Sequence, residues 1–290
     1  MRALMPRSGV PAPQARPRLD LSGPRLRRSL EALVAGADTH GGIERYMDAL
    51  KLKAAVFREA LGDEAGDGRL DVETVRPLCG FMPTVRRRIV PWLEEPAWGT
   101  LRAALGRLLE ATDDAARTDE RIARFCAVFP QDERHRWTRD FAVELLHNLD
   151  PERYPLMTRW VWDAATNTGV LREIWYGPDV DHATIAARDD YDTFLVLREE
   201  ISQFLSTNGV FRDVLHMVDM VCAQVYAEYI CEQGGSYLRA DFTAPEDPMQ
   251  HTRRLLGLDG VRATDGRARF AALDGEAQEA HAGAAPRTLA

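Results

Sequence analysis

Apolar residues recur every three or four positions through most of the middle of the chain. In the stretch 42–61 (GIERYMDALKLKAAVFREAL) they are Ile43, Tyr46, Met47, Leu50, Ala54, Phe57 and Leu61. This spacing matches one face of an α-helix. The same spacing returns over residues 97–111, 119–129, 135–149 and 189–209. The pattern therefore predicts five amphipathic helices, each with one face turned toward a shared core.

Two further segments complete the helical pattern. Residues 210–235 (VFRDVLHMVDMVCAQVYAEYICEQGG) are apolar around most of a helical circumference, which predicts a long buried central helix near residues 210–232 that ends at Gly234–Gly235. A short helix follows over 246–260, with Asp247 as its cap, Pro248 as its first residue and Gly257 at its end. Strand signals are weak, although residues 169–176 could form a short strand or hairpin arm. The expected fold is all-α, a single compact multi-helix domain.

The two ends of the chain lack this periodicity. Residues 1–27 hold five prolines and six arginines, which predicts a disordered tail. Residues 261–290 are rich in alanine, glycine and arginine, which predicts a flexible C-terminal tail. The helical domain is expected over 28–260. No apolar run approaches the roughly 20 residues that span a bilayer, and none near the N-terminus is typical of a signal peptide, so the expected location is the cytoplasm.

The net charge and the spacing of the cysteines disfavour two classes of function, nucleic-acid binding and Cys-x-x-Cys chemistry. The chain has a formal net charge of −8, and residues 1–30 carry seven arginines against one acid, so the other 260 residues carry −14. A body this acidic repels phosphate backbones, which disfavours nucleic acid as a partner. Cys79, Cys126, Cys222 and Cys231 are widely spaced and form no Cys-x-x-Cys pair, which predicts reduced, buried thiols. Lys51 and Lys53 are the two lysines among 37 basic residues, a bias typical of GC-rich coding.

The stretch 147–163 (HNLDPERYPLMTRWVWD) concentrates unusual residues. Asp150 is placed to cap a turn that begins at Pro151, and Pro155 is placed to start the next helix. On that helix Met157, Trp160 and Val161 would point inward.

Three further expectations follow for the same stretch. Arg159 and Asp163 lie four residues apart and would pair on the new helix. Trp160 and Trp162 would point about 200° apart, so one should be core and the other should lie at the surface or in a groove. His147, Arg153 and Asp163 have no obvious structural role, and they are the candidate ligand- or partner-binding residues of this stretch.

The segment Arg139–Asp163 resembles a helix–turn–helix junction of the 8-oxoguanine DNA glycosylase (helix-hairpin-helix) superfamily. The matching residues are Leu146, His147, Asp150, Pro151, Glu152, Arg153, Tyr154 and Pro155. The resemblance implies a helical protein that acts on DNA, with Asp163 as the nearby carboxylate that would activate the nucleophile. The family's active-site motifs are absent, because no glycine-rich hairpin is present and both lysines lie in the first predicted helix. The turn is therefore equally explained as a junction between two helices.

Two pairs of acid and histidine have the spacing of metal ligands. Glu144 and His147 form Glu-x-x-His in one predicted helix, and Asp213 and His216 form Asp-x-x-His in another. Residues three apart share a helix face, so two such pairs with extra carboxylates can build a di-iron site. Glu199, Glu200 and Glu228 could supply those carboxylates. The competing interpretation is that these histidines are capping or satisfied buried residues; no cofactor is expected, and di-iron remains the alternative.

Two more segments carry candidate binding residues. Arg86, Arg87 and Arg88 lie on a predicted helix that Pro83 opens and Pro91 ends, where they could bind a phosphate or an acidic partner, or pair with acids of the same chain. Tyr226, Tyr229, Tyr237 and Arg239 lie around the end of the long helix. They are suited to a partner surface or to a packing face.

No nucleophile–base pair, cofactor loop or closed metal spacing emerges from the sequence. The leading hypothesis is a non-catalytic helical accessory or interaction protein, such as an assembly or adaptor factor of a larger redox or metabolic complex, with another protein as its partner. The alternatives are a di-iron helical-bundle enzyme and a DNA-processing relative of the helical glycosylases. The identity of the partner, the pathway and the oligomeric state stay open.

Overall fold

The chain folds into α-helices joined by short turns. The computed structural model describes residues 16–62, 70–177, 182–237, 247–259, 261–264 and 267–270. For residues 233–237 and the two strands, it describes the backbone alone. The helices are α1 (Gly23–Asp38), α2 (Ile43–Leu61), α3 (Val72–Cys79), α4 (Ala97–Leu109), α5 (Thr118–Cys126), α6 (Trp137–Leu149), α7 (Val170–Glu173), α8 (Tyr191–Thr207), α9 (Val214–Tyr237) and α10 (Pro248–Leu255). Single 3₁₀ turns are η1 (Val90–Trp92), η2 (Ala115–Arg117) and η3 (Glu133–His135). The all-α prediction is confirmed.

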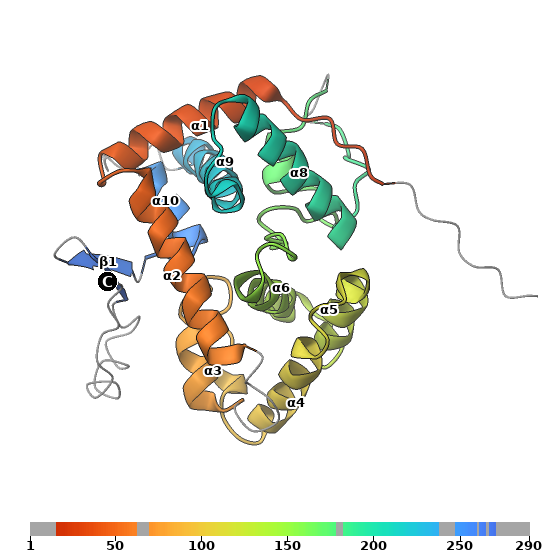
Figure 1. Cartoon of the computed structure of the whole chain (residues 1–290). Coiled ribbons are helices and arrows are strands. Elements are labelled where there is room, and N and C mark those ends of the chain that lie inside the picture. The colour runs from red at the N-terminus through yellow and green to blue at the C-terminus, as the bar shows by residue number, and fades with distance from the viewer. Residues whose placement is uncertain are drawn as a thin grey trace, which may run out of the picture.

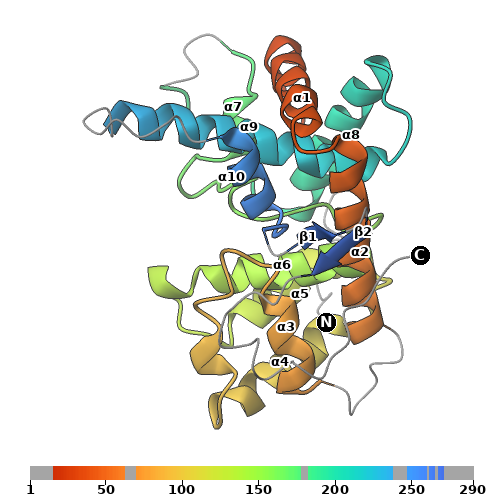
Figure 2. The same ribbon diagram turned by 90° about the vertical axis from the view of Figure 1, so that its left-hand side faces the viewer.

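The helices form two halves around one core. Figures 1 and 2 show α1, α8, α9 and α10 in one half and α3, α4 and α5 in the other, with α2 running along both and α6 lying at their junction. The buried apolar side chains of both halves belong to one continuous cluster. The described residues therefore fold as one domain, as expected. None of their helices is long and apolar enough to cross a membrane.

The predicted central helix is α9, which packs against α1, α2, α7, α8 and α10. Its stretch from Met217 to Val225 is fully buried, which confirms the prediction. The helix continues to Tyr237, beyond the glycine pair at which it was expected to end. Its buried polar residues Asp219 and Gln224 are paired with His147 and Thr252, so its burial leaves them satisfied.

The helical body starts before the boundary expected at residue 28. Ser22 caps α1 by accepting a hydrogen bond from the Arg25 amide, and Leu19 and Leu26 are buried. The apolar pattern had indicated neither α1 nor the short α3. Residues 1–15 of the predicted N-terminal tail lie outside the described part. In the predicted C-terminal tail, β1 (Val261–Thr264) and β2 (Arg267–Phe270) pair as an antiparallel hairpin.

The helix expected to start at Pro155 does not form, so that prediction was wrong. Residues 155–169 are irregular, with turns at Thr158–Trp162 and a bridge between Asp163 and Thr168. Both Trp160 and Trp162 are buried, at 7% and 0% exposure, which corrects the expectation that one would lie at the surface or in a groove. An α-helix directs residues 160 and 162 to nearly opposite sides, so burying both favours an irregular backbone.

Gly169 lets the end of this irregular segment approach the backbone of Trp160 and Val161. Its φ is +120°, and a Cβ atom there would lie 2.8 Å from the carbonyl oxygen of Val161. The amides of Val170 and Leu171 then donate to the carbonyls of Trp160 and Val161. The next residues form α7, so the strand predicted over 169–176 is replaced by one helical turn, apart from an isolated bridge between Leu21 and Trp175.

The helix predicted around the three arginines is also corrected. Residues 83–89 form successive turns and only Val90–Trp92 reach the 3₁₀ conformation. The C-terminal helix, in contrast, forms as predicted: Asp247 accepts a hydrogen bond from the Met249 amide, Pro248 is the first residue, and Gly257 ends the segment with φ +68°.

Candidate functional site

A buried cluster of charged side chains joins α2, α6 and α9. The Lys53 ammonium of α2 lies 3.4 Å from the Glu144 carboxylate of α6 and donates to the carbonyl of Leu256, at the end of α10, at 3.0 Å. Lys53 and Glu144 are 4% and 3% exposed, so neither reaches bulk water. Buried charges of this kind need a partner, and here three elements are held together by one ammonium group.

One turn further along α6, His147 uses both ring nitrogens. Its Nε2 lies 3.2 Å from the Asp219 carboxylate of α9, and its Nδ1 lies 2.8 Å from the Tyr154 carbonyl. A protonated imidazole can donate to both oxygens at once. His147 therefore fastens α9 and the 150–155 turn to the end of α6.

Burial and pairing shift the protonation of this cluster. Burial raises the pKa of Glu144 to about 7, against the opposing effect of the Lys53 charge. Burial tends to lower the pKa of His147, but the Asp219 carboxylate outweighs it and the pKa is raised. Burial lowers the pKa of His216, with Asp219 opposing the change. The cluster thus holds one carboxyl group, that of Glu144, with a pKa near neutral pH.

The four candidate metal ligands do not converge. Glu144 is directed to Lys53, His147 to Asp219, and the Asp213 carboxylate to Lys51 at 2.7 Å. Asp213 precedes α9 with φ +51° instead of lying on the helix face with His216. Within the described residues, no group of three or more His, Cys, Asp or Glu side chains is arranged to hold a metal ion.

Most side chains of the 147–163 stretch serve the fold. Asp150 accepts from the Arg153 amide, so the predicted cap is present. Arg153 also donates to the Thr112 carbonyl at 2.9 Å. The predicted Arg159–Asp163 pair is absent and that prediction was wrong: Arg159 binds Asp140 at 2.8 Å and Asp163 binds Arg136.

Tyr154 anchors the same stretch to the α4–α5 connection. Its hydroxyl donates to the Thr112 carbonyl and accepts from Arg121 at 2.8 Å, and its ring is fully buried. The segment that carries the resemblance to DNA glycosylases is therefore a firmly tied junction. Whether the resemblance extends to function stays a prediction.

The other two candidate sets lie apart from this junction. Arg86 pairs with Asp259 at 2.8 Å, and Arg87 and Arg88 are exposed. The ring centroid of Tyr226 lies 5.7 Å from that of Tyr229 and 6.0 Å from that of Trp160, so these rings pack against one another. For Tyr237 and Arg239, the relevant side chains lie outside the described part.

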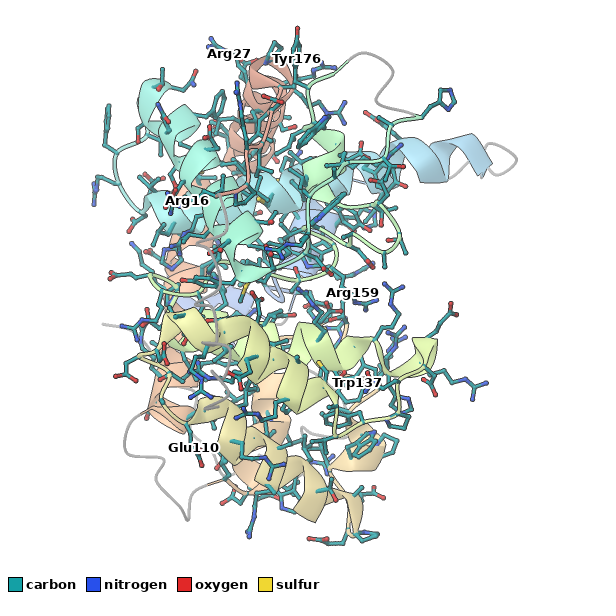
Figure 3. The ribbon with its side chains drawn as sticks, turned by 90° about the vertical axis from the view of Figure 1, so that its right-hand side faces the viewer. Arg16, Arg27, Glu110, Trp137, Arg159 and Tyr176 are labelled. Carbon is teal, nitrogen blue, oxygen red and sulfur yellow. The ribbon has the colours of Figure 1, made fainter. Side chains whose placement is uncertain are left out.

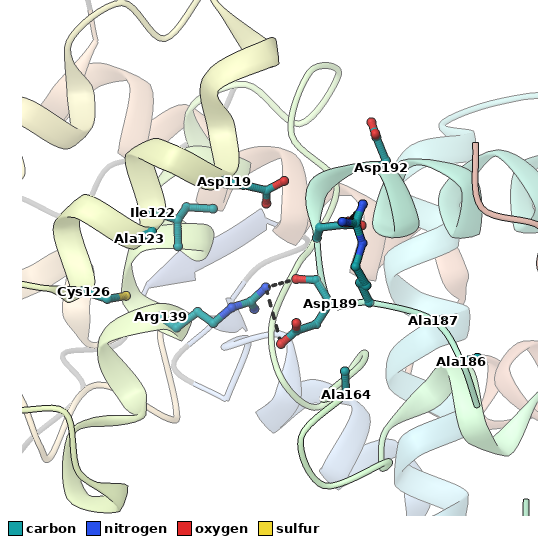
Figure 4. Close-up of a pocket in the computed structure, with 12 residues that line it drawn as sticks. Asp119, Ile122, Ala123, Cys126, Arg139, Ala164, Ala186, Ala187, Asp189 and Asp192 are labelled. Atoms are coloured by element: carbon teal, nitrogen blue, oxygen red, sulfur yellow. Dashed lines mark hydrogen bonds and ion pairs between the residues drawn. The ribbon is translucent and has the colours of Figure 1, made fainter. Parts of the chain in front are cut away.

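An open pocket of about 870 Å³ lies between the two halves. Figure 4 shows α5 and α6 on one side and the segment leading into α8 on the other. Its apolar lining comes from Ile122, Ala123, Cys126, Ala164, Ala186 and Ala187, and its polar lining from Asp119, Arg139, Arg188, Asp189, Asp190 and Asp192. Pockets that bind ligands have volumes of about 300–1,000 Å³, so this one has the size of a binding site.

The two arginines of the pocket each lie against an aspartate of the same pocket. Arg139 of α6 reaches across to the Asp189 carbonyl and lies 4.0 Å from its carboxylate (Figure 4). Arg188 lies 2.5 Å from the Asp190 carboxylate, which also caps α8. Each of these arginines thus has an aspartate of the pocket as its counterion.

Two aspartates of the pocket, Asp119 and Asp192, form no ion pair among the described residues. Asp119 accepts from the Tyr191 amide at 3.0 Å, and Asp192 points from the first turn of α8 toward solvent. Desolvation by the pocket wall raises the pKa of Asp119, although the residue as a whole is exposed. The carboxylates of Asp190 and Asp192 add to the rise, and the Tyr191 amide and the Arg139 charge oppose it. The four aspartates and two arginines give the pocket a formal charge of −2.

The sequence pattern did not indicate this pocket. Its residues come from four separate stretches, 119–126, 139, 164 and 186–192. The only signal in the sequence was the acidic run RDDYD (188–192) at the start of α8, which is typical of an ordinary helix start. Cys126 contributes a thiol whose pKa is raised by burial, so it is not a reactive thiolate.

No protein-family model matches this chain, and no curated protein or solved structure matches it significantly.

Proposed function

We propose that this chain is a non-catalytic helical accessory protein that binds another protein through the pocket between α5–α6 and residues 186–192. The element that enters the pocket is an arginine or lysine side chain flanked by apolar residues. The observation that carries the proposal is the net negative lining of the pocket, in which Asp119 and Asp192 form no ion pair, beside an apolar wall.

Charge and shape both support a cationic, partly apolar occupant. A guanidinium group binds carboxylates through two parallel hydrogen bonds, and its planar face packs on apolar atoms. Ile122 and the surrounding alanines provide those atoms, while Asp119 and Asp192 provide the carboxylates. The acidic body of the chain would also speed the approach of a basic partner.

The internal pairing of the other candidates supports a binding role over catalysis. Glu144, His147, Asp163 and Arg153 each hold the fold together through a named partner. A general acid or base must reach its substrate, and Glu144 is 3% exposed. All four cysteines are free, which is consistent with the proposed location in the reducing cytoplasm.

The test is a titration with a defined peptide, acetyl-Gly-Arg-Leu-Arg-Gly-amide, followed through the backbone amide signals of Ala123, Ala164 and Ala186. We expect these signals to shift, and the affinity to fall as salt is raised, because the contact is electrostatic. Asp192→Asn should weaken binding at least fivefold, which is about 1 kcal/mol, the usual size of an exposed charge contact.

Glu200→Gln is the matched control. Glu200 lies on the same helix and is exposed, and it does not line the pocket. This variant should bind the peptide like the wild type. Absence of shifts at the three alanines, or equal losses in the two variants, would remove the proposed binding site.

A further inference from the structure

The surroundings of His147 are satisfied by its protonated form alone. Its Nε2 lies 3.2 Å from the Asp219 carboxylate and its Nδ1 lies 2.8 Å from the Tyr154 carbonyl, and both of these groups only accept hydrogen bonds. A neutral imidazole has one N–H and one lone pair, so it can donate to one of the two oxygens at a time. The side chain is 12% exposed, which leaves little access for water to replace a lost contact.

Loss of the proton should break the contact with Tyr154 and keep the one with Asp219. A carboxylate is the stronger acceptor, so the remaining N–H stays on Nε2. The lone pair of Nδ1 then faces the lone pairs of the Tyr154 carbonyl, which repel it. Deprotonation therefore pushes the 150–155 turn away from α6. Figure 3 shows Arg159, which follows this turn, at the level where the two halves of the molecule meet, so the movement acts at their junction.

Tyr191 connects the 150–155 turn to the wall of the pocket. Its hydroxyl donates to the Arg153 carbonyl at 2.8 Å, and its ring packs edge-on against that of Tyr154 at a centroid distance of 6.4 Å. Its backbone amide donates to the Asp119 carboxylate, which lines the pocket, at 3.0 Å. One residue thus contacts the turn with its side chain and the pocket wall with its backbone.

Four charged or titratable groups act on His147 from three helices. They are Asp219 and His216 of α9, Lys53 of α2, and Glu144 of α6 itself. Burial lowers the pKa of His147 and the Lys53 charge adds to this, but the Asp219 carboxylate and the Tyr154 carbonyl outweigh both. The pKa of His147 is therefore raised above its ordinary value of 6.5, and the proton leaves above that pH.

We propose that His147 is a proton switch that couples the 150–155 turn to the wall of the pocket. With the proton in place, the turn is held against α6, and Tyr191 keeps its contacts with the turn and with Asp119. Without the proton the turn withdraws, and the bonded tyrosine shifts the pocket segment on either side of it. A chain of hydrogen bonds of this kind can carry coupling between two sites. The switch needs no ligand, so it stands independently of the proposed partner.

The test is a pH titration of the full-length protein from pH 5.5 to pH 9, followed by NMR. The His147 ring should titrate with a midpoint above 6.5, and the backbone amide signals of Tyr154, Tyr191 and Asp119 should shift with that same midpoint. In His147→Gln this shared titration should disappear from all three amides. Wild-type amides that do not follow the His147 ring, or that titrate unchanged in the variant, would overturn the inference.

Two variants separate His147 from its titratable neighbours. His216→Gln is the matched control, because it removes the other imidazole of the same cluster and should leave the three amides following His147. Glu144→Gln removes the carboxyl group whose pKa is about 7, and the amides should again follow His147. Amide titrations that vanish in either of these variants while the His147 ring still titrates would assign the effect to the neighbour and contradict the switch.

Tyr191→Phe tests the path and leaves His147 and its partners in place. It removes the hydroxyl that binds the Arg153 carbonyl and keeps the ring. The Tyr154 amide should still follow the His147 ring, whereas the Asp119 amide should lose most of its shift. An Asp119 shift of wild-type size in this variant would show that the pocket wall is not coupled through Tyr191, and the proposal would be wrong even if His147→Gln failed to fold.

Discussion

The buried cluster at Lys53 and the open pocket at Asp119 show two ways of using charged side chains. In the cluster, Lys53 faces Glu144 and His147 faces Asp219, so each positive group has a negative one. In the pocket, four aspartates meet two arginines, and a formal charge of −2 remains. The interior cannot hold unpaired charge because desolvation costs several kcal/mol for each ion. Water solvates the excess in the pocket, which leaves it available to a ligand.

The two regions also hold the fold differently. The cluster connects α2, α6, α9 and the end of α10, whereas the pocket connects the halves mainly through Arg139 and the contact of Asp119 with the Tyr191 amide. We therefore expect variants in the cluster to change stability and variants at Asp192 to change binding.

Removing Lys53 should have the largest effect. Lys53→Met leaves the Glu144 carboxylate buried without a counterion, which should lower the free energy of unfolding at pH 8 by about 3–5 kcal/mol. The loss should be smaller at pH 5.5, where Glu144 is mostly protonated, because burial holds its pKa at about 7. Urea denaturation at both pH values measures this. Lys51→Met is the control, because its pair with Asp213 is partly exposed and should contribute below about 1 kcal/mol. Equal losses in the two variants would contradict the contrast.

The second effect is the pH dependence of stability. The folded pKa of Glu144, about 7, lies above its ordinary value of 4.5, so its contribution is fully present below pH 4.5 and is lost as the pH rises through 7. We expect the free energy of unfolding to fall by about 2 kcal/mol from this group between pH 5 and pH 8.

Glu144→Gln isolates that contribution. His147, with its raised pKa, adds a loss in the same direction above pH 6.5, whereas His216, with its lowered pKa, gives a gain as the pH rises toward 6.5. The difference between wild type and Glu144→Gln subtracts the titration of both histidines, apart from the electrostatic coupling between His147 and Glu144. A difference that stays constant from pH 5 to pH 8 would show that Glu144 does not titrate in this range.

The smallest effect on stability should be at the pocket. Asp192→Asn removes an exposed carboxylate with no cationic partner among the described residues, so the free energy of unfolding should change by less than about 0.5 kcal/mol. The same variant should still bind the Gly-Arg-Leu-Arg-Gly peptide more weakly than the wild type. A variant that loses both stability and binding would mean that the pocket is a structural junction like the cluster.

The apolar pattern by itself determined which segments form amphipathic helices with one buried face. The segments that form α2, α4, α5, α6, α8 and α9 were predicted to be helical because their apolar residues repeat at the helical period. The capping roles of Asp150 and Asp247 were predicted from hydrogen bonds that each makes to a nearby amide. These signals act within a few residues of chain, so no knowledge of distant contacts is needed.

Only the tertiary structure decided the conformation of residues 155–169 and the partners of the charged residues. Burying Trp160 and Trp162 together outweighed the helical tendency after Pro155. Lys53 contacts Glu144 and Leu256, which lie 91 and 203 positions along the chain from it. Arg16 pairs with Glu199 across a separation of 183 positions. Local sequence carries no information on such distances. The pairing of charges, and therefore the location of the unpaired ones, is set by which helices the core brings together.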